Sequence, residues 1–353
     1  MSGGVDSSVA AVLLREGDCE VFGLTARTRP SESRLCSDAD VAQARRVADH
    51  VGIAHYAVDV SDAFEREVLR YFADEYAVGR TPTPCAVCNR AVKFGVLLRE
   101  ARAHGATHLA TGHYAANLPG RDGYFHLHRG ADPAKDQSYF LFALSQEQLR
   151  HVLFPLADMR KPQVRAFAAE RGLPVVERPE SQDLCFSRPG EHWRIVEHYR
   201  PDARKPGHVV TLDGKVLGRH EGLHRFTIGQ RKGLGVAAGR RMYVAALRPA
   251  TNEVVLAERD RLSGRRLTAG DVRWISGQAP PEPYRAAVQI RYNHRAAPAR
   301  IVPAADGTAA VVFDEPQFAV TPGQAAVFYR GRELIGGGWI ETLMSASGFQ
   351  RPG

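Results

Sequence analysis

The chain opens with Met1-Ser2-Gly3-Gly4-Val5-Asp6-Ser7-Ser8, which runs directly into the apolar segment 9–14. Two successive glycines let the backbone approach an anion, and the amides and hydroxyls that follow lie at the positive end of a helix dipole. A Walker A loop would add a Lys before its Ser or Thr, but the next basic residue here is Arg15. The stretch predicts a phosphate loop suited to pyrophosphate as leaving group. The simpler alternative is a glycine turn before a helix with serine caps.

The composition is that of a globular protein with two or three domains: 353 residues, of which 44% are hydrophobic and 24% charged. A net charge of +8 favours a polyanionic partner, although a basic enzyme without one has the same charge. No apolar run approaches the length of a membrane span and no signal-peptide pattern is present, so we expect a cytoplasmic protein without a membrane partner. Five cysteines, an odd and sparse set, indicate reduced thiols.

Strand and helix patterns alternate along the first part of the chain. Strands are predicted at 20–25, 55–60 and 108–111, and helices at 37–51, from Ser61 through Phe72, and from about Asn89 to Ala103. This alternation predicts a parallel sheet with helices on both faces and ligands beyond the carboxyl ends of its strands. Those ends include Ala26, Gly112 and His113.

Two thiols, Cys85 and Cys88, follow a segment at 79–84 that two prolines make rigid. A zinc site would need two further ligands at a suitable spacing, which the sequence does not offer. Thiols at a helix start beside Arg90 and Lys93 are expected to have a lowered pKa, which favours chemistry over a structural role. Cys185 lies in a polar loop between Arg178 and Arg188, although a lone cysteine is more often structural.

Beyond about Gly190 the chain becomes rich in glycine, proline and turn dipeptides, which places a domain boundary there. The run at 224–235 interleaves basic residues with glycine, typical of a surface that follows a phosphate backbone, or of a solvated basic turn. Short β-type stretches at 285–292, 309–313 and 325–329 predict a small antiparallel barrel or sandwich.

Six motifs occur in the order and spacing of one family: 2–8, 79–94, 110–114, 135–141, 181–186 and 226–234. The chain resembles the bacterial tRNA-specific 2-thiouridylases of the PP-loop ATP pyrophosphatase superfamily. The resemblance implies a PP-loop catalytic domain at 1–189, a central tRNA-binding domain at 190–265, a C-terminal β-barrel at 266–344 and a tail at 345–353. Members place a strand before the loop, so we expect that strand to be missing here because the start codon is assigned too far downstream.

The resemblance also implies a reaction, in which ATP activates the C2 oxygen of the wobble uridine (U34) in tRNAs of the Lys, Glu and Gln type. Sulfur then replaces that oxygen, and AMP and pyrophosphate are released. Cys185 would carry a persulfide received from a sulfur-relay protein, and Cys88 would attack it, either freeing sulfide or closing a transient Cys88–Cys185 disulfide. Such a disulfide needs α-carbons within about 7 Å, so the two segments are expected to meet.

The family pattern assigns binding roles as well. Residues expected at ATP are Ser2, Gly3, Gly4, Val5, Asp6, Ser7, Ser8, Ala26 and Gly112. Residues expected at tRNA are Thr83, Pro84, Cys85, His113, Lys135, Asp136, Gln137, Arg291, Tyr292 and Gln324. Mg²⁺ is expected with ATP, with Asp6 as an open candidate ligand, and no resident metal site and no oligomer are expected.

One departure from the family pattern is Cys85, where several members have an Asp proposed as an acid/base group. Cys85 could replace that group, pair with Cys88 or pack beside the target base, and its role stays open. Two other classes remain. A different PP-loop enzyme, which adenylylates a carboxylate or free nucleotide, would not need tRNA or Cys185. A nonenzymatic RNA-binding protein would tolerate the loss of both cysteines.

Overall fold

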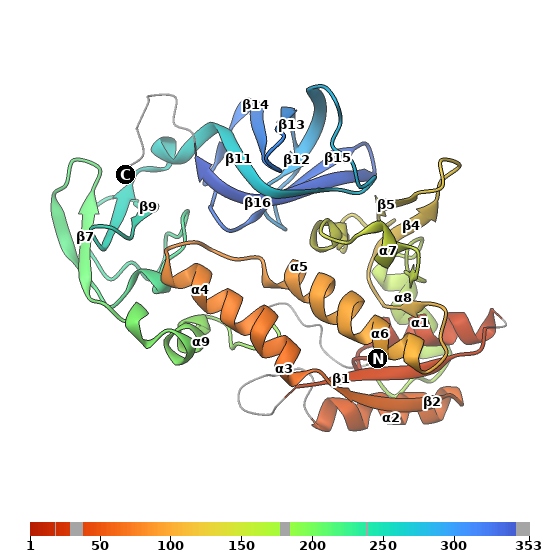
Figure 1. The fold of residues 1–353 in the computed structure, drawn as a ribbon. Helices are drawn as coiled ribbons and strands as arrows, with labels where there is room; N and C mark the ends of the chain where they lie inside the picture. Colours follow the sequence, from red (N-terminus) through yellow and green to blue (C-terminus); the bar gives the residue numbers. More distant parts are fainter. Residues whose placement is uncertain (18, 29–37, 177–183, 238, 344–353) are drawn as a thin grey trace.

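The computed structural model describes residues 1–17, 19–28, 38–176, 184–237 and 239–343. Figure 1 shows an N-terminal α/β part, a small β domain to one side, and a barrel that lies over the helices of the first part. The predictions made for Ser37, Arg178, residues 181–183 and the tail fall outside the described residues.

The N-terminal part contains two parallel strand pairs that are not hydrogen-bonded to each other. β1 (Phe22–Arg27) pairs with β2 (Ala54–Asp59), and β3 (Leu109–Ala110) pairs with β6 (Val152–Leu153). The predicted strands are therefore present, with ends shifted by one or two residues. Apolar side chains of three helices pack together beside them, namely those of α1 (Val5–Glu16), α2 (Asp38–Val51) and α8 (Lys161–Glu170).

Two long helices cross this part, and each contains a π-helical middle. The first consists of α3 (Ser61–Phe64), η1 (Glu65–Arg70) and α4 (Tyr71–Ala77), and the second of α5 (Pro84–Cys88), η2 (Asn89–Leu97) and α6 (Leu98–Ala103). The prediction that the second begins near Asn89 is wrong. It begins at Pro84, because the fixed φ of proline suits a first helical position. Cys85 and Cys88 are therefore helical.

Shorter elements complete the N-terminal part. A turn at Asp122-Gly123 joins β4 (Ala115–Pro119) to β5 (Phe125–Arg129) in an antiparallel hairpin. The remaining elements are η3 (Ser138–Leu141), α7 (Gln146–Leu149), α9 (His192–Tyr199) and η4 (Pro201–Ala203). None of the helices in the described ranges has both the length and the apolar character that crossing a membrane requires.

The central domain is a four-stranded sheet in the order β8-β7-β10-β9. Its strands are β7 (Gly207–Thr211), β8 (Val216–His220), β9 (Tyr243–Arg248) and β10 (Glu253–Ala257), with η5 (Leu223–Arg225) and η6 (Arg259–Leu262) beside them. β7 and β10 are parallel, and the other pairs are antiparallel. Buried Val209, Val244 and Leu256 form its core with Phe226 from the basic run.

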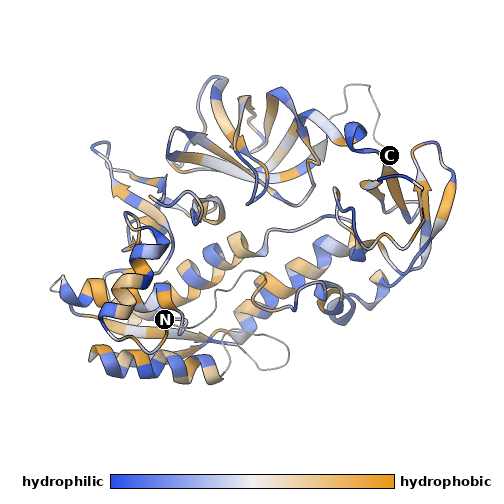
Figure 2. Ribbon diagram, turned by 180° about the vertical axis from the view of Figure 1, so that it is seen from behind, coloured by the Kyte–Doolittle hydropathy of each residue, from blue (hydrophilic) through white to orange (hydrophobic). Residues whose placement is uncertain are grey.

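The C-terminal region is a closed antiparallel barrel of six strands: β11 (Ser263–Trp274), β12 (Tyr284–Gln289), β13 (Ala297–Pro303), β14 (Ala309–Phe318), β15 (Ala325–Arg330) and β16 (Glu333–Leu343). The order β11-β14-β13-β12-β15-β16 closes through β11 and β16. The prediction of a barrel is thus confirmed over a sandwich. Hydrophobic residues are frequent along its strands in Figure 2, and the buried set includes Leu267, Val311 and Phe328.

The barrel and the N-terminal part share structure. β5 of the N-terminal hairpin continues the barrel sheet, with Leu127 opposite Leu334 of β16. One apolar core contains Phe94 and Phe142 from the N-terminal part together with Val327 and Trp339 from the barrel. The barrel is therefore fixed on the helix that carries Cys85 and Cys88.

Candidate active site

The glycine loop ends in a helix start, as predicted. Gly3 has a φ of +67°, and Gly4 is the extended N-cap of α1. The hydroxyls of Ser7 and Ser8 donate to the Gly4 carbonyl at 3.1 and 2.8 Å. The first-turn amides of a helix lack intrahelical partners, so the loop presents donors suited to an anion.

Gly112, at the end of β3, lies against this loop. A Cβ at residue 112 would come within 2.7 Å of the Asp6 carbonyl carbon and 2.8 Å of the Ser7 nitrogen. Two segments that are far apart in sequence thus touch where only glycine fits. Both belong to the predicted ATP set.

Asp6 is held by two residues that come from other elements. Lys161, at the start of α8, places Nζ 2.7 and 2.8 Å from the two Asp6 carboxylate oxygens. The Tyr114 hydroxyl donates to Asp6 Oδ1 at 2.7 Å. The contact of Lys161 with Asp6 could not be predicted from the sequence, because 155 residues separate the two and no motif spacing connects them.

The segment before the cysteines is clamped by a barrel loop. The Thr81 amide donates to the Pro322 carbonyl at 2.8 Å. The Gln324 side-chain amide donates to the carbonyls of Thr81 and Pro82 at 3.0 and 3.1 Å. Thr83 and Pro84 are buried beside it. The structure therefore gives Gln324, a predicted tRNA contact, a position from which it orients the start of α5.

The π-helical segment η2 is supported by side-chain amides. Gln148 donates to the carbonyls of Arg90 and Phe94 at 2.8 and 2.9 Å, and buried Asn89 donates to the Phe140 carbonyl at 3.0 Å. A π-helical stretch shifts the normal hydrogen-bond pattern, so external donors of this kind stabilise it. The last of these bonds joins the cysteine helix to the 135–141 motif.

Cys88 and Cys185 pack against one apolar cluster, which includes Phe64, Phe72 and Phe186. Ala26, near the carboxyl end of β1, packs against the same cluster. The two predicted catalytic thiols, nearly a hundred residues apart in sequence, and a predicted ATP residue therefore pack against the same apolar cluster. Both thiols are partly buried.

Cys85 differs from these two because it is exposed. Neighbouring protein atoms nevertheless limit the hydration of its thiolate and raise the pKa of the Cys85 thiol, whereas the positive charge of Lys93 lowers that pKa by less. The prediction of a lowered pKa at this helix start is therefore wrong for Cys85. Desolvation of the thiolate outweighs the nearby positive charge.

His113 lies close to the same lysine. It is buried, and its Nδ1 is 2.7 Å from the Thr111 hydroxyl. Burial, followed by Lys93, lowers the pKa of His113 well below 6.5. The imidazole is therefore neutral near pH 7, so any contact that it makes with tRNA would be a neutral hydrogen bond.

The 135–137 segment contains both a buried residue that stabilises the fold and a partly exposed residue. Asp136 is buried and accepts hydrogen bonds from Arg129 at 2.6 Å and from the Ser138 hydroxyl at 3.0 Å. Gln137 accepts the Tyr114 amide at 3.1 Å, whereas Lys135 is partly exposed. Of the three predicted tRNA contacts, Lys135 is thus a partly exposed cation, whereas Asp136 is buried.

A polar chain joins Asp136 to the barrel loop that holds Arg291 and Tyr292. Arg129 donates to Gln289 at 2.9 Å, and Gln289 donates to the Tyr292 carbonyl at 2.8 Å. The ring of Tyr292, 36% exposed, lies 4.7 Å from that of Phe140 at an angle of 30°. Arg291 donates to the carbonyls of Phe318 and Ala319. Arg129 and Gln289 escaped the sequence analysis, since neither belongs to a motif.

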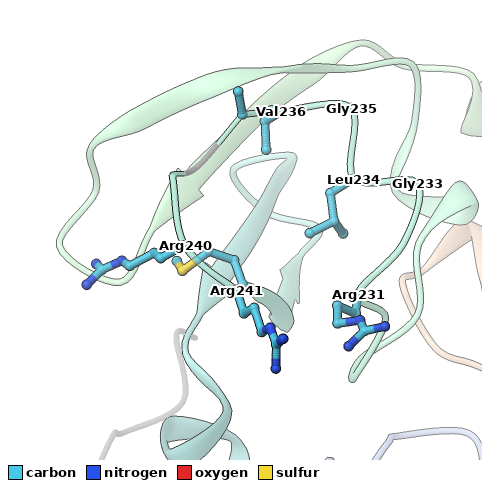
Figure 3. A pocket seen from close by; sticks show the side chains of 9 residues that line it. Arg231, Gly233, Leu234, Gly235, Val236, Arg240 and Arg241 are labelled. Carbon is cyan, nitrogen blue, oxygen red and sulfur yellow. The ribbon is translucent and has the colours of Figure 1, made fainter.

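A separate basic pocket lies in the central domain. It has a volume of about 720 Å³ and is lined by Arg231, Leu234, Val236, Arg240 and Arg241, with neighbouring glycines. Figure 3 shows Arg231 and Arg241 directed to the same side of the opening, while Arg240 extends away. The predicted basic run thus forms part of a concave surface. Within the described ranges, no three His, Cys, Asp or Glu side chains gather as a metal site.

Comparison with families of known proteins assigns a class to each region. Residues 1–188 match the tRNA methyl transferase HUP domain, residues 194–258 the tRNA methyl transferase PRC-barrel domain, and residues 264–340 the aminomethyltransferase β-barrel domain. The fold and site therefore define a HUP-domain protein of the tRNA-modification class, with a central PRC-barrel domain and a C-terminal β-barrel.

Curated relatives give a finer assignment. The tRNA-specific 2-thiouridylase MnmA of Geobacter metallireducens is 46% identical over 98% of this chain and 96% of its own length. The proteins of the same name from Solibacter usitatus and Carboxydothermus hydrogenoformans are 48% and 45% identical, over 97% and 98% of this chain and over 98% and 97% of their own lengths. The chain belongs to the tRNA-specific 2-thiouridylase family.

Proposed function

We propose that this chain is an ATP-dependent tRNA-uridine 2-sulfurtransferase. Its substrate would be the wobble uridine of tRNAs of the Lys, Glu and Gln type, and its products 2-thiouridine, AMP and pyrophosphate. The names of the relatives support thiolation of tRNA. The observation that carries the proposal is that Cys88, Cys185 and Ala26 all pack against one apolar cluster.

The first step is activation of a poor leaving group. The uracil C2 oxygen attacks the α-phosphorus of ATP, and the bond to the β-phosphate oxygen breaks, so pyrophosphate leaves. The amides of the loop and α1 are suited to hold that anion. Asp6, whose side chain is about one-third exposed, fits a Mg²⁺ ion, which would neutralise phosphate charge when bound.

The second step transfers sulfur. The terminal sulfur of a Cys185 persulfide attacks C2, and AMP leaves with the former C2 oxygen. The Cys88 thiolate then attacks the Cys185 sulfur, which breaks the S–S bond, leaves a thiocarbonyl at C2 and closes a Cys88–Cys185 disulfide. Alternatively, Cys88 attacks first and frees hydrosulfide, which then attacks C2. Either route oxidises the two cysteines by two electrons, so a thiol reductant must reset the enzyme.

Recognition of tRNA would use the barrel edge and the central domain. The exposed Tyr292, backed by Phe140, offers an aromatic face on which an unpaired base could stack. Lys135, which is partly exposed, and the arginines that line the central pocket would contact backbone phosphates. A persulfide-donor protein would load Cys185, and the enzyme would act as a monomer in the cytoplasm.

Single-turnover thiolation tests the proposal. Purified protein is mixed with Mg-ATP, unmodified tRNA for Lys and a persulfide donor, and the nucleosides are measured by mass spectrometry. We expect 2-thiouridine only when both ATP and tRNA are present. Cys88→Ser and Cys185→Ser should lose transfer, whereas Cys19→Ser, which changes an exposed thiol beyond the C-terminal end of α1, should keep it.

Two other outcomes would identify a different protein. Cleavage of ATP without tRNA, and without thiouridine, would indicate a PP-loop enzyme with a small-molecule acceptor. Binding of tRNA with no thiolation, unchanged in both cysteine variants, would indicate a nonenzymatic RNA-binding protein.

A further inference from the structure

The glycine loop has no lysine of its own, but the fold brings one to it. Lys161 reaches the loop from α8 and contacts both carboxylate oxygens of Asp6. Its side chain is 9% exposed, and that of Asp6 is 35% exposed. The cation is therefore set into the protein behind a carboxylate that solvent reaches.

The backbone of Lys161 is held in place by a hydrogen bond to another part of the fold. Its amide donates to Asp132 Oδ2 at 2.9 Å, and Asp132 is itself buried. The Tyr114 ring lies 5.8 Å from the Lys161 ammonium, and the Tyr114 hydroxyl bonds Asp6. Contacts with Asp6, Tyr114 and Asp132 thus fix the position of the Lys161 ammonium relative to the start of α1.

The charges decide what the lysine does there. A helix N-terminus carries about +0.5 of a charge, so with the Asp6 carboxylate the loop would carry about −0.5 and would repel a phosphate. Lys161 returns the local sum to about +0.5. Pyrophosphate departure adds negative charge at this loop, and an ammonium that is already in place stabilises it without reorganisation.

We propose that Lys161 contacts the phosphates released as pyrophosphate, a task that a Walker A loop gives to the lysine inside the loop. This inference rests on the proposed ATP-dependent function. It gives Asp6 a second task, which is to hold the Lys161 ammonium beside the start of α1.

Binding measurements by isothermal titration calorimetry test this, with the full chain and with Mg-ATP, Mg-pyrophosphate and AMP as ligands. We expect Lys161→Met to weaken ATP and pyrophosphate about tenfold to a hundredfold and to leave AMP nearly unchanged, because a charge-assisted bond to phosphate is lost. Arg160→Met removes the same charge from the preceding, exposed residue and should change none of the three.

A second pair of variants separates binding from folding, since Lys161→Met leaves Asp6 with an unmatched charge. Asp6→Asn/Lys161→Met removes both charges and is compared with Asp6→Asn alone. We expect the double variant to bind pyrophosphate about tenfold more weakly than Asp6→Asn. Equal affinity in these two variants would overturn the proposal and leave Lys161 as a structural partner of Asp6. Wild-type protein that binds neither ATP nor pyrophosphate would overturn the proposed function as well.

Discussion

Gly112 is the residue where the loop is most sensitive to change. A methyl group at residue 112 would meet backbone atoms of Asp6 and Ser7 below 3.0 Å, and backbone cannot swing aside as a side chain can. We expect Gly112→Ala to cost about 1–3 kcal/mol of stability and to weaken ATP binding, because the loop must shift. Thermal unfolding and ATP titration measure both effects.

The control for this prediction is Gly17→Ala, at the other end of α1. There the added Cβ would lie 3.4 Å from the Leu13 carbonyl oxygen, an ordinary contact. Gly17→Ala should therefore keep ATP affinity. If Gly112→Ala binds ATP as the wild type does, the close approach of β3 to the loop has no role in the site.

Local chemistry predicted some residues of the site and could not predict others. The glycine loop and the helix that follows it could be predicted from the backbone preferences of adjacent residues, although the N-cap is Gly4 and not a serine. Lys161 and Arg129 act across the fold, so no local pattern marks them. The raised pKa of Cys85 could not be predicted either, because the hydration of the thiolate depends on which protein atoms lie around it in the fold.

At the scale of elements, the clamp between the 321–324 loop and the start of α5 makes a specific prediction for Gln324. Gln324→Met keeps the size of the side chain but leaves the carbonyls of Thr81 and Pro82 without these donors. We expect kcat for thiolation to fall severalfold with little change in KM for tRNA, because Cys88 would be misplaced. Steady-state kinetics with tRNA as the varied substrate measure the two constants.

A direct contact between Gln324 and tRNA gives the opposite pattern, in which KM rises and kcat holds. A suitable control is Gln317→Met on β14, whose side chain bonds His294 and the Glu315 carbonyl instead of the cysteine segment. It should leave both constants near wild type.

Element types were easier to predict from sequence than element limits. The barrel was predicted because short β-type stretches follow one another at 285–292, 309–313 and 325–329, and strands lie at each of these places. The start of the cysteine helix was not predicted, because two prolines suggested an extended segment while Pro84 opens a helix. The π-helical stretch depends on Gln148, fifty residues beyond it, so it could not be predicted locally.

For the whole molecule, His126 connects the N-terminal hairpin to the barrel in a pH-dependent way. Its Nδ1 is 2.8 Å from Glu333 on β16 and its Nε2 3.1 Å from Asp122. The carboxylate of Glu333 first, and then that of Asp122, raise the pKa of His126 above 6.5. A raised folded pKa means that the stabilisation is complete below pH 6.5 and is lost as the pH rises through the folded value.

We therefore expect the urea midpoint of the wild type to fall between about pH 6 and pH 8.5 by more than that of His126→Gln. The difference should be at most about 1 kcal/mol, since the ring is partly exposed. His198→Gln, an exposed change on α9, should keep the wild-type pH dependence. The same slope in His126→Gln and wild type would show that this connection does not respond to pH.

The core that Phe94 and Phe142 share with Val327 and Trp339 has a consequence for biosynthesis. A ribosome delivers the N-terminal half first, yet that half cannot cover its apolar side chains or pair the β5 edge until β16 has been made. The nascent polypeptide must therefore stay partly open while roughly the second half of the chain is translated, up to β16 near the C-terminus. During that interval the uncovered apolar side chains are a binding surface for chaperones. A chain truncated before the barrel would keep that surface exposed, so we expect it to aggregate and not to act as a smaller enzyme.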